Sequence, residues 1–345
     1  QISQFKLPLC IKGQLEVEDE NGNTLIIRIN RAHQEEDTGK LTHSGGETLI
    51  DFNRSGVPLV EIVTEPDFTS SAQVKDYAKA LQQIFRYLGV SNADMERGDM
   101  RLEANVSVRL VGQATLPNYR VELKNINSFR FMQAAIEYEI KRQIEMLEKG
   151  KGLPQETRGW DEDKKCTYLQ RSKEEAHDYR YFPEPDLPEL RIKQLALKIQ
   201  GKTAELPGQK LKRFCEEYGL TKAQAVILTE SKELADYFEK AVNLRKVEPV
   251  QIANLVINKK IDINKVSPEE IISQILGKTA GIISDEKELE KLAKEAIEEN
   301  PKAVAYYQAG KEAALQVLIG AVMKKSQGKA EPGKVREILF ALLKA

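Results

Sequence analysis

Two short stretches, Glu103-Ala-Asn-Val-Ser-Val-Arg109 and Arg120-Val-Glu-Leu-Lys124, alternate between polar and apolar residues. Successive side chains of a β-strand point to opposite faces, so this alternation predicts two strands with one polar and one apolar face each. The loop between them, centred on residues 112–118, is short enough for a hairpin. The sequence therefore predicts a sheet with an apolar back and a charged front. That front consists of Glu103, Asn105, Ser107, Arg109, Arg120, Glu122 and Lys124.

The sequence before these strands is also mainly β. A hairpin is expected where the apolar runs 15–17 and 25–29 flank the turn residues Asn21-Gly22, since glycine-containing loops commonly join such runs. Residues 57–63 form a further apolar run of strand length.

Two amphipathic helices are expected beside the strands. Residues 71–88 carry an apolar stripe at helical spacing, with Ser70 or Ser71 as the N-cap and Gly89 as the residue that ends the helix. Residues 128–149 carry a second stripe, with Asn127 or Ser128 at its start.

The character of the chain changes near residue 206, where the sequence becomes helical and rich in Lys and Glu. The stretch Glu205-Leu-Pro-Gly208 interrupts the pattern, and the glycines between 277 and 281 interrupt it again. We expect an α+β fold in three parts. These are a mainly antiparallel β domain with helices at 1–205, an all-α domain at 206–283 and a small helical tail at 284–345.

Composition excludes several classes of protein. Apolar residues make up 41% of the 345 residues and charged residues 30%, with a net charge of −1, so any contact with nucleic acid must come from a local basic patch. The three cysteines show no paired spacing and favour free thiols in a reducing compartment. No apolar run reaches the length of about 18 residues that spans a membrane. A protein of the cytoplasm or an organelle matrix is expected, and the start at Gln1 suggests that an N-terminal portion is missing.

The charged sheet face has two interpretations. Cross-strand ion pairs on a solvated face are common. The alternative is a magnesium and phosphate site, because Mg²⁺ prefers carboxylate oxygens and neighbouring Lys and Arg neutralise phosphate. A second acidic cluster, His33-Gln-Glu-Glu-Asp-Thr-Gly-Lys40, supports the alternative because we expect it to follow a strand.

Other familiar sites are not indicated. The sequence contains neither a phosphate-binding GxxxxGK[ST] loop nor GxGxxG. Its three histidines, His33, His43 and His177, show no zinc spacing relative to one another, and no serine lies in a nucleophile elbow. The loop Asp178-Tyr-Arg-Tyr-Phe-Pro-Glu-Pro-Asp186 is either a rigid connector or a ligand-facing loop.

Five segments together resemble the B subunit of the Glu-tRNA(Gln)/Asp-tRNA(Asn) amidotransferase. They are HQEEDTGK at 33–40, DFNRSGVPLVEIVTEPD at 51–67, MERGDMRLEANVSVR at 95–109, VELKNINSF at 121–129 and DYRYFPEPDLP at 178–188. They follow the family's order, and the helical remainder resembles its C-terminal part more weakly.

The resemblance implies a cradle-shaped catalytic domain and a tail that binds tRNA. It also implies that Mg-ATP phosphorylates the side-chain carboxylate of misacylated tRNA, and that ammonia from a glutaminase A subunit then gives the amide. A small C subunit completes the implied complex. Two alternatives stay open: a non-catalytic tRNA-binding adaptor, and the archaeal E-subunit paralogue, for whose inserted domain the stretch between Asp186 and Leu206 is short.

The family's metal-binding acids carry over to Glu36, Glu103 and Glu122, although most relatives have Asp at the position of Glu103. A Gly-Leu-Glu-x-His stretch of the family, which completes its metal site, is absent from this sequence. Glu36, Glu122 and Lys124 are the expected catalytic residues. Residues expected to bind phosphate or substrate are Arg101, Asn105, Ser107, Arg109 and Asn127. Residues expected to contact tRNA in the tail are Lys311, Lys324, Lys325, Lys329 and Lys334.

Overall fold

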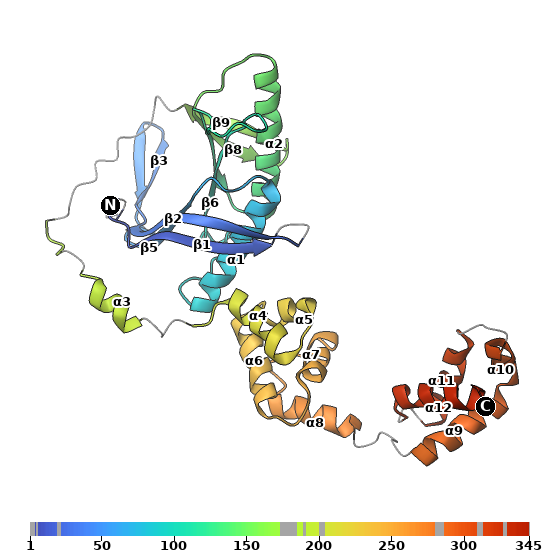
Figure 1. The fold of residues 1–345 in the computed structure, drawn as a ribbon. Helices are drawn as coiled ribbons and strands as arrows, with labels where there is room; N and C mark the ends of the chain where they lie inside the picture. Colours follow the sequence, from blue (N-terminus) through green and yellow to red (C-terminus); the bar gives the residue numbers. More distant parts are fainter. Residues whose placement is uncertain are drawn as a thin grey trace. The chain divides into compact units, whose positions relative to one another are not determined.

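The computed structural model describes residues 4, 6–18, 22–172, 185–188, 191–199, 204–279, 286–308, 313–326 and 330–344. Contacts divide the chain into two units, 1–207 and 208–345. The first contains the described strands, and the described part of the second contains only helices and one isolated bridge residue (Figure 1). The predicted α+β class is therefore confirmed, whereas the domain borders at 206 and 284 stay a prediction.

The first sheet has the strand order β1-β2-β5, formed by Cys10–Glu18, Thr24–Glu36 and Pro58–Thr64. β1 and β2 are antiparallel, with Leu15 opposite Ile27 and Val17 opposite Leu25. This confirms the predicted hairpin pairing, although Asn21 of its turn lies outside the described residues. Val17 and Ile27 are buried with Tyr77 of the helix that packs on this sheet.

That helix, α1 (Ser71–Leu88), begins and ends as predicted. The Ser70 side chain accepts a hydrogen bond from the backbone N–H of Gln73, and the Gln73 side chain in turn accepts one from the backbone N–H of Ser70. Gly89 ends the helix in the left-handed conformation, with φ of 66°. The second predicted helix is α2 (Phe129–Glu148), with Ser128 as its N-cap residue.

The second large sheet carries the charged strand pair. Its order is β6-β7-β8-β9, formed by Leu102–Val106, Val121–Ile126, Glu156–Asp161 and Cys166–Ser172. β7 and β8 are parallel, because α2 connects them as a crossover. Helix α2 lies against this sheet (Figure 1). The buried residues they share confirm the predicted apolar back: Val106, Val121, Leu123, Ile126, Met132, Ala135 and Ile136.

The extent of the charged strands was predicted wrongly. β6 ends at Val106 rather than at Arg109, so the connection to β7 is longer than the expected hairpin loop. Beyond the end of β6, side chains form the hydrogen bonds that a partner strand would otherwise supply. The backbone N–H of Val108 donates to the Tyr119 hydroxyl (3.1 Å), and the Gln143 amide donates to the backbone carbonyl of Val106 (3.1 Å). Leu110 is 80% exposed and contributes nothing to the core.

Strands β3 (Lys40–Ser44) and β4 (Glu47–Asp51) form a two-stranded hairpin that is separate from both other sheets (Figure 1). Leu41 lies opposite Ile50, and every residue of the two strands is exposed.

The helices of the C-terminal half bury two separate apolar clusters. One contains Phe214, Phe238 and Ile252, and the other contains Leu289, Leu318 and Leu339. No described helix is both long and apolar enough to cross a membrane. Helix α3 (Lys193–Ile199) belongs to the first unit. The helices that follow are α4 Pro207–Tyr218, α5 Lys222–Leu228, α6 Lys232–Asn243, α7 Pro249–Asn258, α8 Pro268–Thr279, α9 Glu286–Glu299, α10 Pro301–Gln308, α11 Ala314–Lys325 and α12 Pro332–Lys344.

Candidate functional site

Lys124 lies between two carboxylates on the polar face of β6 and β7. Its Nζ atom is 3.1 Å from Glu103 Oε2 and 3.3 Å from Glu122 Oε1. Burial disfavours the charge most strongly, but the two carboxylates together raise the pKa of Lys124 above its ordinary value. The side chains remain accessible, at 28% for Lys124, 29% for Glu122 and 50% for Glu103. The cluster is therefore charged and open to a ligand.

The pairing of β6 with β7 explains this convergence. Asn105 lies opposite Glu122, so both side chains share the face that carries Lys124. The next strand adds a hydrogen bond, because the Thr157 hydroxyl donates to Glu122 Oε2 at 3.1 Å. Thr157 is 7% exposed, so it fixes Glu122 from the inner side of the site.

Asp37 connects the end of β2 to the start of β6. Its Oδ2 atom accepts from Arg54 Nε and from Arg101, each at 2.9 Å. Although burial is the largest single contribution and opposes ionisation, the hydrogen bond from Arg54 and the charge of Arg101 hold the pKa of Asp37 below its ordinary value. Two arginines on one carboxylate leave an excess positive charge. The two guanidinium groups therefore suit an anion. Their ion pairs with Asp37 also join the segment after Glu36 to the segment before Glu103.

The predicted metal ligands are only partly brought together. Within the described parts of the chain, the group with three ligand atoms within 4.8 Å of one another is His33, Glu35 and Glu61. Glu36, Glu103 and Glu122 do not form such a group, and their role as metal ligands stays a prediction. Their carboxylates nevertheless supply the oxygen donors that Mg²⁺ prefers.

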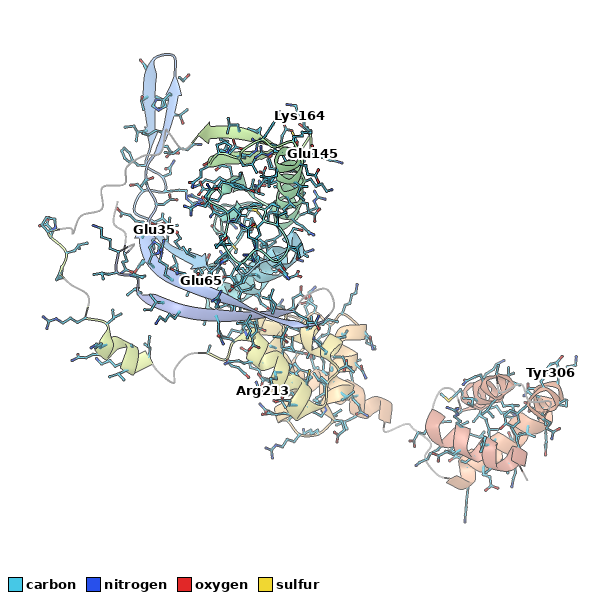
Figure 2. The ribbon with its side chains drawn as sticks, turned by 45° about the horizontal axis from the view of Figure 1, so that its top comes forward. Glu35, Glu65, Glu145, Lys164, Arg213 and Tyr306 are labelled. Carbon is cyan, nitrogen blue, oxygen red and sulfur yellow. The ribbon has the colours of Figure 1, made fainter. Side chains whose placement is uncertain are left out.

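The cluster of His33, Glu35 and Glu61 was missed in the sequence. The acidic motif was expected to follow a strand, but its residues 33–36 belong to β2 itself. Glu35, near the end of β2, is labelled in Figure 2. His33 lies opposite Glu61 on β5, and Glu35 is two residues further along the same face. His33 Nε2 is 3.8 Å from Glu61 Oε2 and 4.0 Å from Glu35 Oε2. The two-residue spacing of His33 and Glu35 was the available signal.

Three other predicted binding residues lie outside the strands. Ser107 and Arg109 follow β6, and Arg109 donates to the backbone carbonyl of Ala114 (3.1 Å). Asn127 is exposed and immediately precedes the N-cap of α2. Their binding roles stay predictions.

Two expected ligand-binding regions are described only in part. Of the loop 178–186, the structure describes Pro185 and Asp186. Of the tail lysines, residues 311 and 329 lie outside the described residues. Lys325 is bound to Glu295 (3.2 Å) and Glu299 (2.6 Å), Lys334 to Glu331 (3.3 Å), and Lys324 is exposed.

Comparison with known families covers both the sheets that carry the charged cluster and most of the helical remainder. Residues 1–198 match the family described as GatB/GatE catalytic domain, and residues 250–343 match the family described as GatB domain. The chain belongs to the GatB family. The match to the catalytic domain contains the Glu103–Lys124–Glu122 cluster and the Asp37 ion pairs.

Curated GatB proteins align with nearly the whole chain. Three similar ones are named as the B subunit of aspartyl/glutamyl-tRNA(Asn/Gln) amidotransferase. The protein of Thermodesulfovibrio yellowstonii is 43% identical over 387 residues, covering 100% of this chain and 81% of that protein. That of Carboxydothermus hydrogenoformans is 42% identical over 386 residues, covering 98% and 80%. That of Persephonella marina is 41% identical over 386 residues, covering 100% and 81%.

Proposed function

We propose that this GatB chain amidates Glu-tRNA(Gln), Asp-tRNA(Asn) or both, at the expense of ATP. ATP gives its terminal phosphoryl group to an oxygen of the side-chain carboxylate, which leaves ADP. Ammonia then attacks the carbonyl carbon, the bond to the phosphate oxygen breaks, and phosphate leaves as the amide forms. Activation is needed because a carboxylate lacks a good leaving group. The proposal rests on the family and on the names of the relatives.

The observation that carries the proposal is the charged cluster of Glu103, Lys124 and Glu122. Lys124 offers an ammonium group to phosphate oxygens or to the substrate carboxylate. Arg101 and Arg54, held by Asp37, offer guanidinium groups of the kind that pair with phosphate. Glu36, Glu103 and Glu122 would hold Mg²⁺, which neutralises phosphate charge when bound. Asn105, Ser107, Arg109 and Asn127 are proposed to line the same substrate path.

The assembly is proposed to include a glutaminase A subunit that supplies ammonia and a small C subunit. The relatives' names each describe one subunit of an amidotransferase, which supports an enzyme of several subunits. We propose that the helical tail contacts the tRNA through exposed lysines such as Lys324, and that the complex works in the cytoplasm or an organelle matrix.

The decisive experiment compares wild type with Glu122→Ala in the complete complex. We expect the variant to lose tRNA-dependent ATP hydrolysis and acyl phosphate formation, while the partner subunit still hydrolyses glutamine. Unchanged tRNA-dependent ATP turnover would falsify the site. Glu145→Ala is the matched control, because Glu145 is 69% exposed on α2 and pairs only loosely with Lys149 at 3.8 Å (Figure 2).

The same complex should be assayed with Glu-tRNA(Gln) and Asp-tRNA(Asn) side by side. Amidation of one or both assigns the substrate. Binding of both tRNAs without ATP turnover by the wild-type complex would favour the non-catalytic adaptor instead.

A further inference from the structure

The alternating pattern of β7 breaks directly after Lys124. In a regular strand, residues 122, 124 and 126 share one face. Glu122 and Lys124 lie on the polar face, yet Ile126 is only 5% exposed and belongs to the core. A regular strand cannot satisfy both requirements.

A β-bulge resolves the conflict. Ala104 lies opposite Leu123, but Leu102 lies opposite Ile126. One residue of β6, Glu103, therefore faces two residues of β7, Lys124 and Asn125. The extra residue shifts the alternation by one position, as bulges do.

Asn125 supplies the backbone conformation at this point. Its φ is 57°, in the left-handed region that L-residues with a Cβ rarely adopt. Asparagine is one of the few residues other than glycine that tolerates this conformation. Its side chain makes a long hydrogen bond to Gln170 Oε1 (3.4 Å).

We propose that Asn125 is a positioning residue of the phosphoryl-transfer site: its left-handed backbone forms the bulge that keeps Lys124 between Glu103 and Glu122 while Ile126 returns to the core. Without the bulge, the strand either moves Ile126 into solvent or turns Lys124 away from its carboxylates, because a one-residue slip reverses the faces. The consequence for catalysis rests on the function proposed above, but the consequence for Lys124 does not.

The test compares Asn125→Gly with Asn125→Val in the full-length chain assembled with its partner subunits. Glycine adopts the left-handed conformation without a steric penalty, whereas a β-branched residue resists it. We expect Asn125→Val to slow single-turnover acyl phosphate formation by about 10-fold or more, with KM for ATP changed much less. Asn125→Gly should stay within about 3-fold of wild type.

Lys165→Val is the matched control for backbone strain. Lys165 also has a left-handed backbone, with φ of 51°, but lies in the exposed turn between β8 and β9. We expect it to lower thermal stability as Asn125→Val does, with wild-type rates.

A second readout follows Lys124 directly. Its acetylation by acetic anhydride, measured by mass spectrometry, should be faster in Asn125→Val than in wild type and unchanged in Asn125→Gly. The proposal is overturned if Asn125→Val and Asn125→Gly form acyl phosphate at the same rate and are acetylated at Lys124 at the same rate. This holds whether both variants resemble wild type or both are impaired. If Glu122→Ala retains tRNA-dependent ATP turnover, the proposed site is wrong, and the labelling still decides the role of Asn125 in placing Lys124.

Discussion

Thr157 and Glu122 are joined across the parallel strands β7 and β8 by a hydrogen bond of 3.1 Å. Because Thr157 is almost completely buried, its hydroxyl holds one carboxylate oxygen of Glu122 in a fixed direction. The other oxygen faces Lys124. Each oxygen of this carboxylate therefore has a separate partner.

Thr157→Val should impair the proposed site without unfolding the sheet. Valine keeps the shape but removes the donor, so Glu122 loses its fixed orientation. Removing a group that orients a metal ligand typically costs about 10- to 100-fold in metal affinity or activity. We expect the Mg²⁺ concentration for half-maximal activity to rise. An equal fall in rate at all Mg²⁺ concentrations would contradict this role, and Thr157→Ser should restore the wild-type dependence.

Asp37→Asn should make the free energy of unfolding less dependent on pH in the acid range. A carboxyl group whose pKa is lowered by folding stabilises the protein above its unfolded pKa of about 3.9, and this contribution is lost as the pH falls through the folded value. At pH 7 the variant should therefore be less stable than wild type, and the difference should shrink below about pH 4.

The single tryptophan provides the measurement. Trp160 lies on β8 in the same unit as Asp37, so its fluorescence follows the unfolding of that unit by urea. If the difference in free energy of unfolding between wild type and Asp37→Asn stays constant from pH 7 to pH 3, Asp37 stabilises the protein through packing rather than through its charge.

Glu139→Ala should be strongly destabilising. Glu139 is fully buried and accepts from Arg142 (2.7 Å), Gln143 (2.9 Å) and Thr167 (3.1 Å). Removing one member of a buried ion pair leaves uncompensated charge and typically costs about 3–5 kcal/mol. Because Arg142 keeps Glu156 as a partner at 2.7 Å, we expect about 3 kcal/mol in the same fluorescence assay.

The comparison for this variant is Glu145→Ala on the exposed side of the same helix. A surface pair such as Glu145 with Lys149 contributes less than about 1 kcal/mol. Similar losses for the two variants would mean that the buried network is not what holds α2 to the sheet.

Ser70→Ala and Ser128→Ala should differ although both residues are N-caps. Ser70 takes part in a capping box on α1, whereas the side chain of Ser128 makes no capping hydrogen bond on α2. Removing a cap costs about 1 kcal/mol, so Ser70→Ala should lose that amount and Ser128→Ala only a few tenths. Thermal and urea midpoints of the first unit measure both, and equal losses would refute the distinction.

Local patterns predicted the parts of the fold that local physics decides. A few neighbouring residues suffice to predict the apolar stripe and caps of α1. The same holds for the alternation around Glu122. The end of β6 was not readable, because Tyr119 and Gln143 supply its hydrogen bonds from 11 and 37 residues away.

The site divides in the same way. Alternation predicted that Glu103, Glu122 and Lys124 share a face, and the structure brings them together. The arginine pair on Asp37 spans 17 and 64 residues, so no local pattern could indicate it. The bulge left a trace in the order Lys124-Asn125-Ile126, where two polar residues interrupt the alternation, but its meaning depends on which residues the core accepts.

The hairpin of β3 and β4 has a consequence for handling the protein. A ribbon of two strands is marginally stable alone and leaves both edges open to pairing with another chain. Leu41 and Ile50 lie opposite one another in this hairpin and are 57% and 53% exposed. They add an exposed apolar surface that favours association with another chain. Expression of the chain without the other subunits should therefore favour precipitation through strand-to-strand association, and replacing Leu41 with lysine should increase its solubility.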